Sequence, residues 1–403
     1  MKKPKLAEKV ACTGCSACKA SCVNKSISMC PDEDGFLRPL VDLSLCVKCG
    51  ACEEVCPVLH SEQHLFADKP CNAPLQVFAA KSKDVKLQMD STSGGVFTLL
   101  AEDVLSKGGV VYGAGWETGS WRVIHKGIET TDELADLRGS KYVQSDMGNV
   151  LCEAKKALKQ GRHVLFTGTP CQVAAANSFL GNPSNLILCE IICHAVPSPK
   201  MWEKYVEEIQ KIKKDHIRVI RFRAPGRTLN ASRFVVEFKN RRRGINQQFA
   251  ASCWGRFFFG EFLIRPSCNA CRFREGKSGA DISIGDFWGL GKCHPEFVDN
   301  KGVSVVIVHT KKGADIFGRQ NVLKVLSSYA FACENNEPIF TSTTPKPKQS
   351  EMFRRVYFHN GGRFIRTVRF VLDGPWYKRY PKYTYWAIRH WVGNILLSLG
   401  LRK

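Results

Sequence analysis

Residues 12–22 read Cys12-Thr-Gly-Cys15-Ser-Ala-Cys18-Lys-Ala-Ser-Cys22, and residues 46–56 read Cys46-Val-Lys-Cys49-Gly-Ala-Cys52-Glu-Glu-Val-Cys56. Both runs space their cysteines as C-x2-C-x2-C-x3-C, the spacing that binds cubane iron–sulfur clusters through four thiolates. In such a pair of runs, the first three cysteines of each bind one cluster and the fourth binds the other. The spacing therefore predicts two 4Fe-4S clusters, one on Cys12, Cys15, Cys18 and Cys56, the other on Cys46, Cys49, Cys52 and Cys22.

Zinc knuckles and a disulfide framework are the two alternatives for so many cysteines. Zinc sites use two C-x2-C pairs, whereas each run here has four cysteines within eleven residues. Disulfides require an oxidising compartment, but the basic start Met1-Lys-Lys-Pro-Lys is followed by no apolar region of a signal peptide. We therefore expect metal-bound cysteines in a reducing, cytoplasmic setting.

The segment between the two runs predicts two short strands, over residues 26–29 and 35–39, joined by a turn rich in Asp and Gly. Together with the cysteine runs, residues 8–60 resemble a bacterial dicluster ferredoxin domain. Val23 follows Cys22 where that pattern usually has proline, while Pro57 follows Cys56 as the pattern requires. The departure changes the geometry of one site slightly and removes no ligand.

The chain has 403 residues, of which 44% are hydrophobic, and it is long enough for two or three globular domains. Its 59 Lys and Arg exceed its 37 Asp and Glu, which gives a formal net charge of +22. Such a charge attracts anionic partners, including acidic redox proteins, anionic lipid, phosphorylated substrates and nucleic acid. No RNA- or DNA-binding module is recognisable, so we do not expect nucleic-acid binding. No apolar run reaches the roughly 20 residues of a membrane span.

Two strand–turn–helix units follow the cysteine runs. The first has the polar turn Ser93-Gly94-Gly95 before a helix whose apolar residues recur at helical spacing over 96–105. The second has a strand over 163–166, the turn Gly168-Thr169-Pro170, and a helix that starts near Cys171, where the helix dipole favours a thiolate. Backbone N–H groups at a helix N-terminus bind phosphate readily, and a capped helix without a ligand is the alternative.

Residues 185–192 form a continuous apolar run, which predicts a central strand of a parallel sheet. Because ligands of parallel α/β sheets gather at the carboxyl ends of strands, we expect Cys171, Cys193 and His194 to lie near one another. Further along, the pattern predicts paired strands over 217–223 and 234–238, a last strand over 303–308 and a helix near 313–326.

Five phrases stand in a fixed order along the chain: Ser91-Thr-Ser-Gly-Gly-Val-Phe97, Gly168-Thr-Pro-Cys-Gln172, Ile192-Cys-His-Ala-Val-Pro-Ser-Pro199, Arg265-Pro-Ser-Cys-Asn-Ala-Cys271 and Asp281-Ile-Ser-Ile-Gly-Asp-Phe-Trp-Gly289. Together with the ferredoxin unit they resemble the family of coenzyme F420 hydrogenase/dehydrogenase beta subunits over residues 8–330. The resemblance implies an FAD-containing iron–sulfur flavoprotein, in which clusters exchange electrons with the flavin. This chain has Ala195 where the family motif usually has glycine.

The same resemblance implies roles for particular residues. The flavin environment would be formed by Ser93, Gly94, Gly95, Gly168, Thr169 and Pro170. A candidate third cluster set is formed by Cys171, Cys193, Cys268 and Cys271, and buried core cysteines are the alternative. His194 and Asp286 are candidates for proton transfer to a reduced flavin or its substrate, with a structural histidine as the alternative.

The tail, residues 341–403, lies outside both resemblances. From Glu351 onward it has eleven Lys and Arg against two acids. Over 383–399 its apolar residues share one helical face, which suits a helix lying in an anionic membrane interface. The tail therefore predicts either peripheral contact with the inner face of the membrane or a helix docked on the protein body.

These observations predict an α/β protein. An α+β ferredoxin-like domain over 1–62 precedes a mixed or parallel-sheet flavin-binding domain in two parts, over 75–150 and 151–335, and a basic tail over 341–403. The predicted function is an iron–sulfur flavoprotein oxidoreductase that passes electrons between two 4Fe-4S clusters and FAD. The alternative is an electron-transfer subunit without substrate chemistry of its own. In either case we expect a redox partner protein or a small electron carrier.

Overall fold

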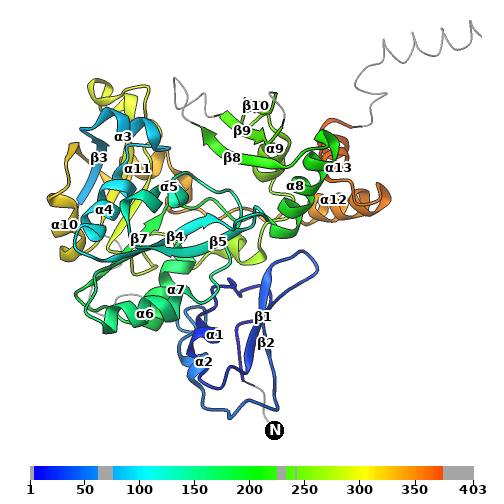
Figure 1. The fold of residues 1–403 in the computed structure, drawn as a ribbon, viewed down its shortest axis with the longest axis horizontal. Helices are drawn as coiled ribbons and strands as arrows, with labels where there is room; N and C mark the ends of the chain where they lie inside the picture. Colours follow the sequence, from blue (N-terminus) through cyan, green and yellow to red (C-terminus); the bar gives the residue numbers. More distant parts are fainter. Residues whose placement is uncertain (1–3, 62–75, 225–232, 241–242, 375–403) are drawn as a thin grey trace, which may run out of the picture.

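The computed structural model describes residues 4–61, 76–224, 233–240 and 243–374. Its described strands form a two-stranded, a three-stranded and an eight-stranded sheet. Figure 1 shows the small N-terminal unit in blue beneath the large sheet, and the three-stranded sheet in green on a separate unit. This mixture of helices with parallel and antiparallel strands confirms the predicted α/β class.

The N-terminal unit contains α1 (Ala17–Ser21), β1 (Ile27–Pro31), β2 (Leu37–Val41) and α2 (Ala51–Glu54). The two strands pair antiparallel, from Ile27 opposite Val41 to Pro31 opposite Leu37, which confirms the two strands predicted between the cysteine runs. Each helix begins after a residue in the left-handed conformation, Ser16 (φ 65°) before α1 and Gly50 (φ 80°) before α2.

The eight-stranded sheet contains, in spatial order, β13 (Val322–Ser327), β3 (Gln76–Ser82), β12 (Ser304–Val308), β11 (Ile282–Asp286), β7 (Leu186–Ile191), β6 (Val164–Gly168), β4 (Val110–Trp116) and β5 (Val123–Ile128). Strands β11, β7, β6 and β4 are parallel to one another, and the remaining pairs are antiparallel. The predicted central strand is therefore confirmed in β7. The carboxyl ends of the four parallel strands meet at one edge of the sheet.

Alternate residues of the central strands enter two different cores, because successive side chains of a strand point to opposite faces. Leu165 of β6 packs with α4 (Val96–Leu105) and α10 (Lys311–Gly318) on one face. Its neighbours Val164 and Phe166 pack with α6 (Val150–Lys159) and α7 (Pro170–Leu180) on the other face. Ala17 of α1 joins this second core, so the N-terminal unit is docked on α7.

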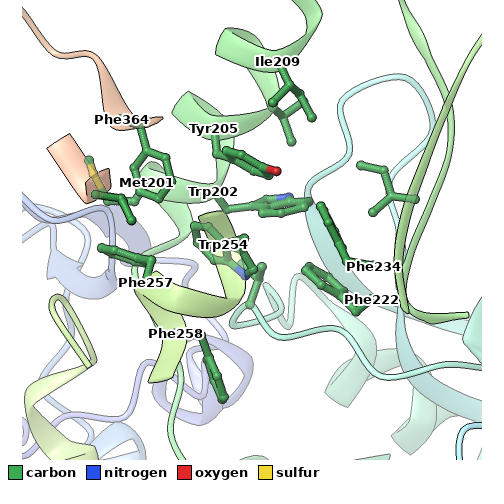
Figure 2. Packing of buried hydrophobic residues seen from close by; sticks show 14 of the residues in the cluster. Met201, Trp202, Tyr205, Ile209, Phe222, Phe234, Trp254, Phe257, Phe258 and Phe364 are labelled. Atoms are coloured by element: carbon green, nitrogen blue, oxygen red, sulfur yellow. The ribbon is translucent and has the colours of Figure 1, made fainter. Parts of the chain in front are cut away.

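The chain between β7 and β11 forms an aromatic unit that α12 (Pro347–His359) and α13 (Phe364–Asp373) complete. It contains α8 (Pro199–Lys213), β8 (Ile217–Ala224), β9 (Arg233–Phe238), β10 (Ile245–Gln248) and α9 (Cys253–Phe259). Figure 2 shows Trp202 and Trp254 at its centre, with ring centroids 4.9 Å apart in an edge-on arrangement. The predicted strand pair is confirmed in β8 and β9, which are antiparallel.

The prediction of a helix near 313–326 is only half right. Helix α10 ends at Gly318, and residues 322–327 form β13, so β12 is not the last strand. The apolar residues of 322–327 fit a short strand as well as a helix turn. Strand β13 pairs with β3 from Val322 opposite Ser82 to Ser327 opposite Val77, and these backbone hydrogen bonds decide the conformation.

The remaining elements of the described residues are short: α3 (Val85–Asp90), η1 (Thr131–Glu133), α5 (Leu134–Leu137), η3 (Pro266–Ala270), η4 (Leu290–Lys292), η5 (Pro295–Phe297), α11 (Tyr329–Glu334) and η6 (Glu337–Ile339). None of the helices in this part of the chain has the length and apolar character that crossing a membrane requires. The amphipathic helix predicted over 383–399 lies outside the described residues.

Candidate iron–sulfur and electron-transfer site

The structure brings Cys12, Cys15, Cys18 and Cys56 together, although Cys56 belongs to the second run. These four residues, which we name the first cysteine set, line one small cavity. Burial raises the pKa of Cys18, and the charges of the other three cysteines raise it further. The grouping is the one that the spacing predicts, while the role of the four thiols as cluster ligands stays a prediction.

The surroundings of the first set fit a cluster. Burial raises the pKa of Cys15 to about 11, so a bare thiol would stay protonated near neutral pH. The Ser16 hydroxyl is buried and has no hydrogen-bond partner among the described residues. Bound iron would supply the positive charge that a thiolate needs, and cluster sulfide would accept a hydrogen bond from the hydroxyl.

The second cysteine set consists of Cys22, Cys46, Cys49 and Cys52 and lies nearer the solvent. The charges of Cys49 and Cys22 act on Cys52, and the Asn24 amide donates to the Leu45 carbonyl at 3.4 Å, which holds the two loops together. Burial raises the pKa of Cys22, but hydrogen bonds from the Ser26 hydroxyl and backbone N–H outweigh it and lower the pKa overall. Cys49 is exposed.

The third cysteine set, formed by Cys171, Cys193, Cys268 and Cys271, lines a cavity of about 320 Å³. Cys171 follows β6 and Cys193 follows β7, so the set lies at the carboxyl edge of the parallel strands, where sequence analysis places these two residues. Burial, followed by the charges of neighbouring thiols, raises the pKa of both cysteines. Burial therefore opposes a thiolate at Cys171, contrary to the expectation from its place at the start of a helix.

Arg274 lines the third-set cavity, and one N–H group of its guanidinium lacks a hydrogen-bond acceptor. Its buried guanidinium donates to the carbonyls of Cys193 at 2.8 Å and His194 at 2.7 Å. Its Nε has no hydrogen-bond partner in the part of the chain that the structure describes. A buried N–H without an acceptor costs about 1–3 kcal/mol. An anionic group in the cavity, bound by four thiols, would satisfy it, so the residues fit an iron–sulfur cluster here too.

The first and third sets are adjacent across the boundary between the N-terminal unit and the large sheet. The charge of Cys15 acts on Cys171. Cys56 lies in one hydrophobic cluster with Ala174 and Phe273, and Cys171 packs against the same cluster. Helix α1 contains Cys18 of the first set, and its C-cap is Cys22 of the second set, so these two sets are adjacent as well. The three sets therefore follow one another from the exposed second set, through the first, to the third at the sheet edge.

The 18 cysteines of the described residues are all free, so the disulfide alternative finds no support in this part of the chain. No group of three or more His, Cys, Asp or Glu in the described ranges is placed to hold a single metal ion. A cubane differs from a single ion because each of its four thiolates binds a different iron. The spread of the first and third cysteine sets around a cavity suits that arrangement.

The predicted flavin turn Ser93–Gly95 lies elsewhere along the sheet edge, between β3 and β12. The N–H of Gly94 donates to the Ser304 hydroxyl at 2.9 Å, so it is not available to a phosphate. A Cβ on Gly94 would lie 2.2 Å from the Ala80 carbonyl oxygen. Packing therefore explains this glycine. Gly95, in the left-handed conformation (φ 86°), and Ser93 stay candidates for the flavin environment.

The second predicted turn belongs to the third-set cavity. Thr169 and Pro170 line this cavity, and Gly168 ends β6 beside them. The Thr169 N–H and hydroxyl both donate to Gln172 Oε1 at 3.0 Å, and Pro170 has no N–H to offer. The start of α7 is thus capped by its own residues. In the structure this turn forms a wall of the cysteine cavity.

The two candidate proton-transfer residues have different partners. His194 lines the third-set cavity, and its Nε2 lies 2.8 Å from Glu261 Oε1. Glu261 also pairs with Lys346 at 2.6 Å. Asp286 instead accepts from Arg223 at 2.6 Å, and it is not among the residues that line the third-set cavity. Only His194 is therefore placed to exchange protons next to the third set.

Buried His125 contacts the end of β6, next to the turn Gly168–Pro170, and makes the stability of the protein depend on pH. His125 contacts the Ser145 hydroxyl at 2.7 Å and the Thr167 carbonyl at 2.9 Å. Burial lowers its pKa from 6.5 to about 4. Between these values the unfolded chain binds a proton that the folded chain does not. The stability contributed by neutral His125 is therefore complete above pH 6.5 and is lost as the pH falls toward 4, by about 1.4 kcal/mol per pH unit.

We expect His125→Gln to flatten this pH dependence. The measurement is the free energy of unfolding in urea, near neutral pH and again near pH 5, for the wild type and the variant. Between the two conditions, the free energy of unfolding should fall by about 2 kcal/mol more in the wild type than in the variant. Equal losses in both proteins would contradict the assignment of the titration to His125.

Three residues of the site were not predicted from the sequence: Arg265, Arg274 and Glu261. Arg265 opens the phrase that carries Cys268, and that position is the signal that could have identified it. Arg274 has no such signal, because the cavity that it closes is formed by segments far apart in the chain. Glu261 is held in the left-handed conformation (φ 53°), which is rare for a residue other than glycine and is visible only in the structure.

The fold and the cysteine sets together define an iron–sulfur protein with a mixed-sheet α/β body. Family models match three parts of the chain: a 4Fe-4S dicluster domain over 11–59, and the N-terminal and C-terminal parts of the coenzyme F420 hydrogenase/dehydrogenase beta subunit over 77–152 and 161–327. The chain belongs to this family of beta subunits and carries a dicluster 4Fe-4S domain in front of the two matched parts.

Two known proteins are similar to this chain. It is 24% identical over 225 residues to one of the subunits of F(420)H(2) dehydrogenase from Methanosarcina mazei, a match that covers 52% of this chain and 62% of that relative. It is also similar, at 18% identity and a TM-score of 0.45, to a polypeptide of the xenon-derivatised F420-reducing NiFe hydrogenase complex from Methanosarcina barkeri. That match covers 72% of this chain and 95% of the other.

Proposed function

We propose that this chain passes electrons between a bound FAD and a redox partner through three 4Fe-4S clusters, one on each cysteine set. The observation that carries the proposal is the continuous series of the three sets, from exposed Cys49 to the cavity at the sheet edge. A chain with a single isolated cluster would need no such series. The adjacency of the first and third sets supports the third cluster in particular.

When bound, the clusters exchange single electrons and the flavin converts them to two-electron chemistry. The residues of this chain have three tasks around these groups. The cysteines hold the clusters, and Phe273 and Ala174 exclude water between the first and third sets. His194, which Glu261 orients, can donate or accept a proton at the third-set cavity.

The flavin enters this proposal through the family resemblance. Ser93 and Gly95 precede α4, and the first turn of a helix leaves backbone N–H groups that suit a phosphate. Gly94 contributes by packing alone. The Methanosarcina mazei relative is named for F(420)H(2), so the reduced deazaflavin is the first two-electron donor to test with this chain.

The first test is anaerobic purification with iron, sulfide and flavin measured on one sample. We expect about twelve irons and one FAD per chain. Cys268→Ala should reduce the iron content to about eight while the flavin stays bound, because it removes only the cluster of the third set. Cys293→Ala is the matched control, since Cys293 lies outside the three sets, and it should leave both contents unchanged.

Each other outcome has a definite meaning. About eight irons in the wild type, unchanged in Cys268→Ala, would remove the third cluster from the proposal. About eight irons without flavin, even after reconstitution with FAD, would favour the second candidate, an electron-transfer subunit without substrate chemistry of its own. The exposed second set, at the end of the series, is the observation that favours this candidate, because it suits delivery of electrons to a partner enzyme.

A further inference from the structure

Arg265 is a buried cation placed between two of the three cysteine sets. Its side chain is among the largest fully buried ones, at 1% exposure. The guanidinium donates through Nη1 to the Cys12 carbonyl at 2.9 Å and through Nε to Gln144 Oε1 at 2.7 Å. It also lies over the Phe36 ring, 4.9 Å from the centroid. The charges of Cys12, in the first set, and of Cys268 and Cys171, in the third set, all act on it.

The charge of Arg265 is not neutralised by its hydrogen-bond partners. These partners are a side-chain amide and the backbone carbonyls of Cys12 and Leu37, all of which are neutral. Neighbouring Arg38 differs, because its guanidinium pairs with Asp32 at 3.0 Å. An arginine guanidinium stays protonated in proteins, so Arg265 keeps its positive charge.

We propose that Arg265 raises the reduction potentials of the clusters on the first and third cysteine sets together. This inference rests on the proposed function. Reduction adds one negative charge to a cluster, and a fixed cation in a region of low dielectric stabilises the reduced form more than the oxidised form. Because one guanidinium lies beside both sets, its charge shifts the two potentials in the same direction.

A purely structural role is the competing explanation. Arg265 links the Cys12 loop and Leu37 of the N-terminal unit to Gln144 of the sheet unit, so its loss would also weaken domain docking. If Arg265 only holds the cysteine loop in place, its replacement would lower the stability of the protein and leave the reduction potentials of the clusters unchanged. The potential is therefore the readout that separates the two roles.

The experiment is an anaerobic redox titration of the full, cluster-loaded chain, followed by electron paramagnetic resonance, in Arg265→Gln, Arg265→Lys and the wild type. At a fixed solution potential, Arg265→Gln should lower the ratio of reduced to oxidised cluster at least tenfold for the first and third sets. This change corresponds to a fall in reduction potential of about 59 mV for a one-electron couple. Arg265→Lys keeps the charge and should shift the ratio much less. The cluster of the second set is an internal reference that should not move.

Arg274→Gln is the comparison variant. Arg274 lines the third-set cavity but not the first-set cavity, so its loss should shift the third-set cluster without the first. Unchanged potentials in Arg265→Gln with all clusters bound would overturn the inference, and so would equal shifts in the Lys and Gln variants. If Arg265→Gln does not fold, the small shift in Arg265→Lys and the single shift in Arg274→Gln are still required. Failure of the proposed function would look different, since the wild type itself would then lack the cluster signals.

Discussion

Cys56→Ala is expected to abolish rapid electron transfer between the exposed end of the chain and the sheet edge. Cys56 lies in the second run of the sequence, but the structure groups it with Cys12, Cys15 and Cys18. Its loss removes a ligand from the cluster in the middle of the series, and about four irons should be lost with it. The measurement combines iron analysis with stopped-flow reduction by a one-electron donor that reaches the second set.

Because the structure groups Cys56 with the first run, variants of the other cysteines serve as controls for this prediction. Cys15→Ala should cause the same loss of paramagnetic signal as Cys56→Ala, and Cys22→Ala should match Cys49→Ala instead. Cys152→Ala removes an exposed free cysteine outside the three sets and should change neither iron content nor rate. If Cys56→Ala removed the same signal as Cys49→Ala, each run would bind its own cluster and the grouping would be wrong.

Gly94→Ala is expected to lower the free energy of unfolding by about 3 kcal/mol, a large effect for the addition of one methyl group. The new Cβ would lie 2.2 Å from the Ala80 carbonyl oxygen and 2.8 Å from the Ser304 N–H nitrogen. Both atoms belong to backbone of the β3–β12 pair, which cannot shift without breaking the sheet ladder. Urea unfolding monitored by circular dichroism measures the loss.

Gly318→Ala is the control for this prediction. Gly318 is exposed at the end of α10 and has open space where a Cβ would be placed. Alanine there should leave the stability unchanged or raise it by up to about 0.5 kcal/mol, because alanine favours a helix more than glycine does. If Gly94→Ala keeps the stability but loses FAD, the glycine serves the flavin phosphate and the packing explanation is wrong.

The sequence alone predicts most of the elements that carry the site. The spacing of each cysteine run predicts the grouping with Cys56 and Cys22 exchanged, because the distance from the third to the fourth cysteine places the last one past the start of a helix. Strand β7 and helices α4 and α7 are predicted because apolar periodicity within one segment depends only on neighbouring residues. The second half of the helix predicted near 313–326 is wrong, since residues 322–327 pair with β3, far away in the chain, and form a strand.

The third cysteine set marks the limit of what the sequence decides. The phrases that carry Cys171, Cys193, Cys268 and Cys271 resemble a family. Only the tertiary fold brings the carboxyl ends of the parallel strands β6 and β7 and the segment of η3 to one cavity. The same holds for Arg265, whose three acceptors come from segments more than a hundred residues away. Local spacing determines which cysteines share a loop, because a loop closes within a few residues. Which loops then share a cavity, and which buried charge lies between them, is decided by packing of the whole chain.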